Sequence, residues 1–141
     1  KACTKMQGQF TSGANTIAQR AAITALTTDL QPTLQMKEAF RQRRDALISR
    51  LQEVPGMQVN HPGGAFYLFP KVSDVFGKSY RGTPIEHADD LSMQLLTQAH
   101  VSMVTGKAFG APDYIRLSYA NSMENLMKAA DRITDFFNEL A

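Results

Sequence analysis

The residue of this sequence best suited to binding an anionic ligand is an arginine within a short, largely apolar segment. Residues 114–120 read Tyr-Ile-Arg-Leu-Ser-Tyr-Ala, so that Ile115 and Leu117 alternate with Arg116 and Ser118. This alternation predicts a strand with one apolar face. A guanidinium grips a carboxylate through two parallel charge-assisted hydrogen bonds. Arg116 is therefore a candidate carboxylate-binding residue, and a solvated or salt-bridged surface arginine is the alternative.

A helix is predicted directly after this strand. Asn121 can cap it, and Glu124 at the third helical position can reach back to the N–H of the cap. The helix carries one apolar stripe, which predicts a buried face. The stripe consists of Leu126, Ala130, Ile133, Phe137 and Leu140.

The elements that must position Arg116 can be predicted upstream. Alanine-rich helical spacing predicts a helix over residues 16–29, and Pro32 opens a long amphipathic helix to about residue 54. Residues 57–60 and 65–69 are two predicted strands, joined as a hairpin by the link 61–64.

The remaining segments complete the predicted architecture. Residues 71–82 form a loop, and Thr83 caps a helix that has Pro84 at its first position. Residues 101–104 form a further strand, followed by the glycine-bearing loop 105–112. The prediction is an α/β protein of the α+β small-domain type. It has a three- to four-stranded sheet with helices mainly on one face, including one long helix.

Composition excludes several classes of protein. The 141 residues are 43% hydrophobic and 20% charged, with a net charge of +2, which is typical of an ordinary globular domain and does not demand nucleic acid. No apolar run approaches the length of a membrane span. The single cysteine, Cys3, excludes an internal disulfide and fits a reducing, cytoplasmic compartment. Because the chain opens on Lys1 without an initiator methionine, we expect it to be a piece of a longer protein.

Other chemistry finds no support. Gly106-Lys107 lacks the earlier glycine and the following hydroxyl of a phosphate loop, and no serine stands in a Gly-x-Ser-x-Gly elbow. The histidines and Cys3 lack metal-ligand spacing, so no metal site is predicted. The run of arginines from Arg41 to Arg44 could touch phosphate or RNA, or form a solvated helix face with Glu38 and Asp45.

Four segments, taken in order, resemble class I aminotransferases of the aspartate aminotransferase type. They are Gln7–Gln19, Gly-Ala-Phe-Tyr at 64–67, Gly-Lys-Ala-Phe-Gly at 106–110 and Tyr-Ile-Arg-Leu-Ser-Tyr-Ala at 114–120. The family commonly has Asn-Pro where this chain has Gly13-Ala14, so no role is transferred to Thr11 or Ser12. The resemblance covers nearly all of this chain but only about the last third of a full enzyme of this family.

The resemblance implies site residues and a cofactor. Arg116 matches the family's arginine that binds the substrate α-carboxylate, and Gly64 and Phe66 match backbone near the substrate cavity. Enzymes of this fold-type I family use pyridoxal 5′-phosphate. No lysine of this chain stands in the family's Ser-Lys cofactor context. We therefore expect no catalytic, cofactor-binding or metal-binding residue in this segment, and no cofactor bound to the fragment.

The predicted function follows from these matches. Residues 1–30 are the tail of a large domain and a linking helix, and residues 31–141 are the C-terminal small domain of an aminotransferase. The full protein transfers an amino group between an amino acid, aspartate being one candidate, and a 2-oxo acid. It works as a homodimer with the missing large domain, and the fragment alone is inactive. The alternative is a free-standing, non-catalytic interaction domain that docks through the helix at residues 16–29.

Overall fold

The computed structural model describes all residues from 1 to 141, and the chain divides into two compact units, Lys1–Met36 and Lys37–Ala141. The first unit holds α1 (Ala2–Thr11), α2 (Thr16–Thr27) and the first residues of α3 (Gln31–Leu51). The second unit holds all the strands and the remaining helices. The two units are described separately.

The first unit has no buried side chain of its own. The predicted helix at residues 16–29 is present as α2, and the Asn15 side chain caps it by accepting the N–H of Ile17 at 2.8 Å. Neither α1 nor α2 contains a buried residue. Several large apolar side chains are instead exposed in this unit: Met6, Phe10, Ile17, Ile23, Leu26, Leu30 and Leu34.

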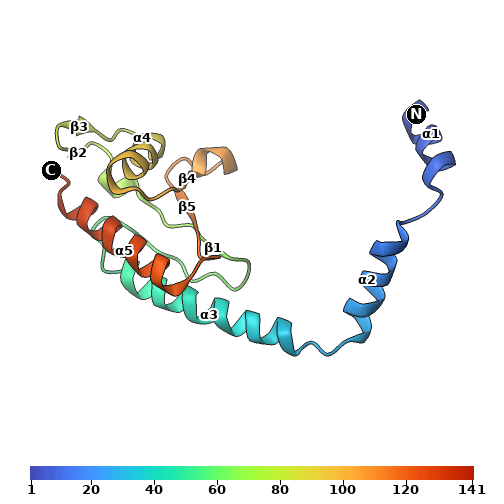
Figure 1. Cartoon of the computed structure of the whole chain (residues 1–141). Helices are drawn as coiled ribbons and strands as arrows, with labels where there is room; N and C mark the ends of the chain where they lie inside the picture. The colour runs from blue at the N-terminus through green and yellow to red at the C-terminus, as the bar shows by residue number, and fades with distance from the viewer. The chain divides into compact units, whose positions relative to one another are not determined.

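A three-stranded antiparallel sheet lies in the second unit (Figure 1). Its order is β1 (Tyr67–Leu68), β5 (Ile115–Ser118) and β4 (Val104–Thr105). Strand β5 is therefore central, and its neighbours approach it from either side. The predicted small α+β domain with a three- to four-stranded sheet is confirmed.

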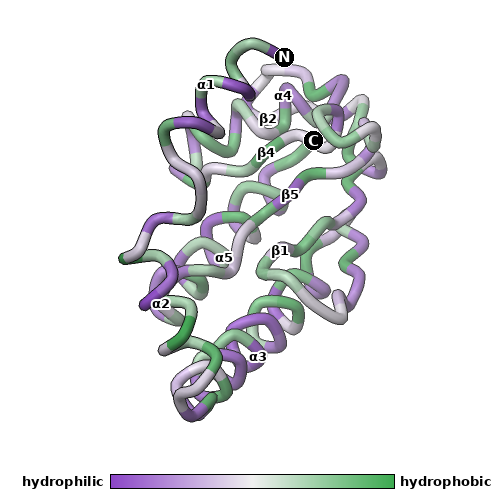
Figure 2. The backbone as a smooth tube through the Cα atoms, turned by 90° about the vertical axis from the view of Figure 1, so that its right-hand side faces the viewer, coloured by the Kyte–Doolittle hydropathy of each residue, from purple (hydrophilic) through white to green (hydrophobic).

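Two helices run side by side against this sheet, as Figure 1 shows for α3 and α5 (Met123–Asn138). The long helix was predicted to end near residue 54 and ends at Leu51. Figure 2 shows both hydrophobic and hydrophilic positions along the two helices. In α3 the buried residues, Leu47, Ile48 and Leu51, lie near the C-terminal end. The core is formed by buried side chains of the two helices and of the sheet, which include Leu47, Leu51, Leu68, Ile115, Leu117, Leu126, Ala130, Ile133 and Phe137.

The predicted hairpin between residues 57–60 and 65–69 is wrong. Gln58 instead pairs with Lys71 in an isolated bridge, in which each residue's N–H donates to the other's carbonyl at 2.9 Å. Strand β1 pairs with β5, which places Leu68 opposite Leu117. Both leucines are buried. Burial of this apolar pair decides the register, and a local turn at residues 61–64 does not.

A second sheet occupies a stretch where a loop and a helix start were predicted. Strands β2 (Ser79–Tyr80) and β3 (Thr83–Pro84) form a hairpin. Its turn residues Arg81 and Gly82 have φ values of 48° and 83°, as a two-residue hairpin turn with positive φ requires. The loop predicted up to residue 82 and the helix predicted from Thr83 are therefore wrong.

The helix α4 (Ala88–Gln94) begins later than predicted. His87 precedes it, and its backbone N–H donates to Asp90 Oδ2 at 2.9 Å, so the cap lies at His87 and Asp90 and not at Thr83. A π-helical turn (Leu95–Ala99) extends α4. The buried side chain of Gln94 donates to the Pro84 carbonyl at 3.0 Å, which ties the hairpin to this helix.

The cap of α5 also lies one residue later than predicted. Ser122 is the cap, and its hydroxyl accepts the N–H of Asn125 at 3.2 Å. Asn121 accepts the N–H of Ser122 at 2.8 Å instead of capping the helix. Glu124 therefore stands at the second helical position, from which the predicted reach back to Asn121 does not occur. The apolar stripe of α5 itself is buried as predicted, with the exception of Leu140, which is half-buried.

Candidate functional site

Arg116 lies in the centre of β5, on the face opposite the core. Ile115 and Leu117 on either side of it are buried at 0% and 5% exposure, whereas Arg116 is half-buried. Because successive side chains of a strand point to opposite faces, the guanidinium lies on the side of the sheet away from the core helices. The structure thus confirms the predicted strand around Arg116.

Two aromatic rings hold the guanidinium of Arg116. Its Cζ lies 4.4 Å from the ring centroid of Tyr67 and 4.3 Å from that of Phe109. Tyr67 belongs to β1, and Phe109 belongs to the 3-10 turn η3 (Gly106–Phe109) that follows β4. The ring contacts therefore come from strand β1 on one side of β5 and from the turn after β4 on the other.

No carboxylate of the chain is paired with Arg116. The ion pairs of the structure involve Arg41, Arg44, Arg50, His61, Arg81 and Lys107. Ring faces attract the cation without using its N–H donors. The N–H groups of Arg116 therefore remain free to bind a planar anion, and a carboxylate is the geometric match.

The turn that carries Phe109 is tightly built. The Thr105 hydroxyl accepts the N–H of Lys107 at 3.3 Å, and the N–H of Gly110 donates to the Lys107 carbonyl at 3.1 Å. Gly106 has no room for a side chain, because a Cβ there would collide with the carbonyl oxygens of Ala111 and Tyr114. The position of Phe109 is therefore fixed by backbone packing.

A charged pair anchors the same turn to α4. Lys107 Nζ lies 3.2 Å from Asp89 Oδ2. The Thr105 hydroxyl and then the Lys107 ammonium hold the pKa of Asp89 below its ordinary value, because both stabilise the carboxylate. These residues line a cavity of about 570 Å³ together with His87 and Asp113.

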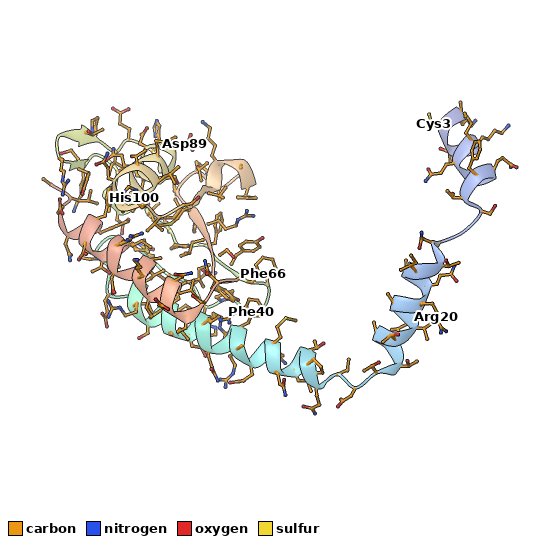
Figure 3. All side chains as sticks on the ribbon, viewed as in Figure 1. Cys3, Arg20, Phe40, Phe66, Asp89 and His100 are labelled. Atoms are coloured by element: carbon orange, nitrogen blue, oxygen red, sulfur yellow. The ribbon has the colours of Figure 1, made fainter.

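Gly64 and Phe66 lie in a different cavity. They line a space of about 280 Å³ with Phe40, Arg44 and Tyr119, and Arg116 is not among its lining residues. Figure 3 shows the labelled side chains of Phe40 and Phe66 close together, where the loop before β1 passes α3. The structure thus places these two candidates beside α3, in a cavity that Arg116 does not line, although the ring of Phe66 lies 4.4 Å from that of Tyr67.

Tyr119 organises this second cavity. Its hydroxyl donates to the Ala65 carbonyl at 2.9 Å, and its N–H donates to the Phe66 carbonyl at 2.9 Å. Burial raises the pKa of Tyr119. Ala65 is held with φ at 59°, a left-handed conformation that is uncommon for a residue with a side chain. The wall of this cavity next to β1 is therefore a bend of the chain that the two hydrogen bonds of Tyr119 hold in place.

Tyr67 and Phe109 contact the Arg116 guanidinium, and sequence reasoning did not connect them with it. Both stand in segments that carry the family resemblance, but neither was assigned a role there. Only the pairing of β1 and β4 with β5 brings them to Arg116. An aromatic residue in each flanking segment was the available signal, and it could not be used without the strand order.

Two of the three arginines at residues 41–44 are paired with carboxylates of their own helix, and the third, Arg43, lies over the ring of Phe40. Arg41 lies 2.7 Å from Glu38 and holds the pKa of Glu38 below its ordinary value through that hydrogen bond. Arg44 lies 2.8 Å from Asp45 and donates to the Pro62 carbonyl at 3.0 Å. This is the arrangement of a helix face whose charges are paired locally.

No group of three or more His, Cys, Asp or Glu side chains in the structure is arranged to hold a metal ion. None of its helices combines the length and the apolarity needed to cross a membrane.

Several known proteins are similar to this chain in sequence and in fold. The family model described as "Aminotransferase class I and II" matches residues 1–133. Aspartate aminotransferase from Streptomyces avermitilis is 39% identical over 99% of this chain, and a bifunctional aspartate and glutamate/aspartate-prephenate aminotransferase from Petunia hybrida is 41% identical over 94%. The crystal structure of the aspartate aminotransferase from Rhizobium meliloti superposes with a TM-score of 0.90 at 35% identity, over 96% of this chain.

These matches cover only part of each relative. The chain spans 34% of the Streptomyces protein, 28% of the Petunia protein and 34% of the Rhizobium chain. An aromatic aminotransferase from Pyrococcus horikoshii is also similar, with a TM-score of 0.81, 32% identity and 35% of its chain covered. The chain thus spans about a third of the length of the relatives that it matches.

Proposed function

Since the chain belongs to the class I and II aminotransferase family, we propose that it is the C-terminal part of a pyridoxal-phosphate-dependent enzyme of the aspartate aminotransferase type. The full protein would transfer an amino group between an amino acid and a 2-oxo acid. The names of the relatives support this proposal, since the Streptomyces and Rhizobium proteins are aspartate aminotransferases. Aspartate is the first substrate to test. Amino acids with aromatic side chains are the second, because the similar protein from Pyrococcus is an aromatic aminotransferase.

Arg116 is proposed to bind the α-carboxylate of the substrate. The observation that carries this role is a half-buried guanidinium fixed over two rings and left without a carboxylate partner. A partly desolvated arginine without an anion is costly to maintain, and a substrate carboxylate would complete it. Two parallel hydrogen bonds would also orient the substrate, because they fix the plane of its carboxylate.

The residues of this chain do not by themselves fit pyridoxal phosphate. That cofactor needs a desolvated lysine amine, a carboxylate for its ring nitrogen and a phosphate cup. Lys107 lines a cavity, but its side chain is 73% exposed and its amine is held by Asp89. Lys37 lines the smaller cavity and is exposed as well. We therefore propose that the cofactor residues lie in the part of the relatives that this chain does not match.

The proposal assigns a role to each part of the chain. Residues 1–30 would be the tail of the large domain and its linking helix, and residues 31–141 the small domain of a homodimer in the cytoplasm. The large apolar side chains exposed in the first unit support a covering partner surface, since Phe10 is 83% and Leu26 86% exposed. The large domain, or the same domain of a second subunit, is the proposed cover.

The proposal is tested by comparing this chain with the full-length protein. Purified full-length protein should transfer the amino group of aspartate to a 2-oxo acid. The 141-residue chain should not, and mixing it with pyridoxal phosphate should give no absorption band that borohydride fixes to one of its lysines. Absence of amino transfer by the full-length protein with any amino acid would overturn the proposal.

The alternative function, a non-catalytic interaction domain, would also explain why helix α2 has no buried residue. The coding sequence upstream of Lys1 separates the two. The aminotransferase proposal expects upstream sequence of about twice the length of this chain, with a lysine in a Ser-Lys context. A stop codon or an unrelated sequence there would favour the interaction domain.

A further inference from the structure

Two aromatic rings, and no carboxylate of the chain, contact the half-buried guanidinium of Arg116. The guanidinium carbon lies almost equally far from the two ring centroids, at 4.4 Å for Tyr67 and 4.3 Å for Phe109. Register adds to this arrangement: Tyr67 stands opposite Ser118 and Val104 stands opposite Arg116. The two rings therefore reach the guanidinium from β1 on one side of β5 and from the turn after β4 on the other.

Phe109 has little other reason to be where it is. Its ring is 49% exposed, so it contributes little to the core. Besides Arg116, its aromatic contact is with Phe69, edge-on at 6.1 Å, and Phe69 in turn stacks on Tyr114 at 5.1 Å. The main contribution of this half-exposed phenylalanine is therefore its cation–π contact with Arg116.

The backbone gives the ring its fixed position. The N–H of Gly106 donates to the Tyr114 carbonyl at 2.7 Å, and the N–H of Ala111 donates to the Gly106 carbonyl at 3.0 Å. Gly110 ends the turn with φ at +73°. The turn is thus tied to the residues just before β5, so Phe109 and Arg116 are held by one framework.

We propose that Phe109 and Tyr67 are positioning residues that hold the Arg116 guanidinium ready for a substrate carboxylate. This inference rests on the proposed function of Arg116. A free arginine side chain loses rotamer freedom when it binds an anion, and a side chain already held by its faces loses less. The rings leave the N–H donors uncovered, so preorganisation does not compete with binding.

The first test is spectroscopic and independent of activity. Full-length protein with isotope-labelled arginine should show Arg116 δ and ε protons shifted upfield by the ring currents, with the signals assigned by their loss in Arg116→Lys. Phe109→Leu should move these signals toward those of solvent-exposed arginines, and Phe109→Tyr should retain them. Signals of Arg116 that are already ordinary in the unchanged protein would overturn the inference.

The second test is kinetic, with L-aspartate as the probe. Phe109→Leu should raise KM by roughly threefold to tenfold while kcat changes by less than about twofold, and Phe109→Tyr should restore KM. The pair Tyr67→Leu and Tyr67→Phe should behave in the same way. An unchanged KM in Phe109→Leu, with Arg116→Lys impaired, would overturn the positioning role and leave the proposed function standing. Unimpaired Arg116→Lys would overturn both, whatever the spectra show.

Discussion

Three arginines of this molecule lie over aromatic rings, Arg43, Arg81 and Arg116, and of these only Arg81 has a carboxylate partner. Arg81 lies in the turn of the β2–β3 hairpin, with its Cζ 5.0 Å from the centroid of Tyr80. Glu139 accepts hydrogen bonds from Arg81 Nε at 3.0 Å and Nη2 at 3.3 Å. Arg116 has two rings and no such partner.

The surroundings of Arg81 explain why its pair is complete. Tyr80 stacks on Phe136 at 4.1 Å, and the N–H groups of Ser79 and Ala141 donate to each other's carbonyls. The pair therefore closes the corner where the hairpin meets the end of α5. The hydrogen bond and charge of Glu139 raise the pKa of Arg81, so the guanidinium stays charged throughout the accessible range.

The difference teaches how to separate a structural arginine from a binding one. Stacking on rings is common to both and does not distinguish them. Arg81 and Arg116 differ in whether the chain itself supplies the anion that the N–H groups need, and Arg116 differs from Arg43 in having two rings where Arg43 has one. At Arg81 the chain supplies the anion and at Arg116 it does not, which supports the proposed ligand-binding role of Arg116. Substitutions at these two positions should therefore have opposite profiles.

The largest effect is expected from Arg116→Lys in the full-length protein. Lysine keeps the charge but loses the planar pair of N–H groups, so kcat/KM for L-aspartate should fall by at least about 30-fold. The matched control, Arg81→Lys, should change kcat/KM by less than about twofold. Steady-state assays over a range of aspartate concentrations measure both. Equal losses of kcat/KM in the two variants would contradict the distinction between a binding role for Arg116 and a structural role for Arg81.

The next largest effect is expected from Gly106→Ala. The added methyl group meets two backbone carbonyls, with Tyr114 O at 2.6 Å, so the turn that holds Phe109 must shift. Urea unfolding should show a loss of about 1–3 kcal/mol in the free energy of unfolding. Gly63→Ala is the control, because nothing lies within 4 Å of its added Cβ, and its effect should stay within about 0.5 kcal/mol.

A smaller effect is expected at the structural arginine. Glu139→Gln removes the carboxylate of Arg81, and Tm should fall by no more than about 3 °C at low salt because the pair is exposed. The difference should vanish near 1 M salt, where exposed charges are screened. A large loss of Tm that persists at high salt would mean that Glu139 acts through packing.

The smallest effect concerns the arginine paired within its own helix. Arg41→Gln should raise the pKa of Glu38 toward its ordinary value, which an NMR titration of the Glu38 side chain would follow. Because the folded-state pKa of Glu38 is depressed, the pair stabilises the protein above the unfolded pKa. That stabilisation is lost as the pH falls through the folded value. A pKa of Glu38 that stays depressed in Arg41→Gln would assign the shift to Gln42, which also donates to Glu38.

Elements that depend on local patterning could be predicted from the sequence. The strand around Arg116 and the buried stripe of α5 follow from periods of two and of about 3.6 residues, and the structure has both. The β2–β3 hairpin was missed because Arg81-Gly82 is a turn without the usual Asn-Gly or Asp-Gly pair. The hairpin at residues 57–69 was wrong because burial of Leu68 against Leu117 chose a distant partner.

The residues of the candidate site also divide into one that the local sequence predicts and others that depend on the fold. Arg116 could be found because its residue type and its strand are local properties of the sequence. Tyr67 and Phe109 could not be assigned to it, because they reach the guanidinium only through the order β1-β5-β4. Gly64 and Phe66 were predicted near the substrate cavity, and in this structure they line a cavity beside α3. Their role in the full-length protein stays a prediction.

The most direct measurement is a crystal structure of the full-length protein with a bound 2-oxo acid. The account predicts both oxygens of one carboxylate at about 2.8–3.0 Å from the N–H groups of Arg116, with the guanidinium still seated over Tyr67 and Phe109. Arg81 should remain bound to Glu139 in the same crystal. A carboxylate held elsewhere, or an Arg116 side chain turned away from both rings, would contradict the account.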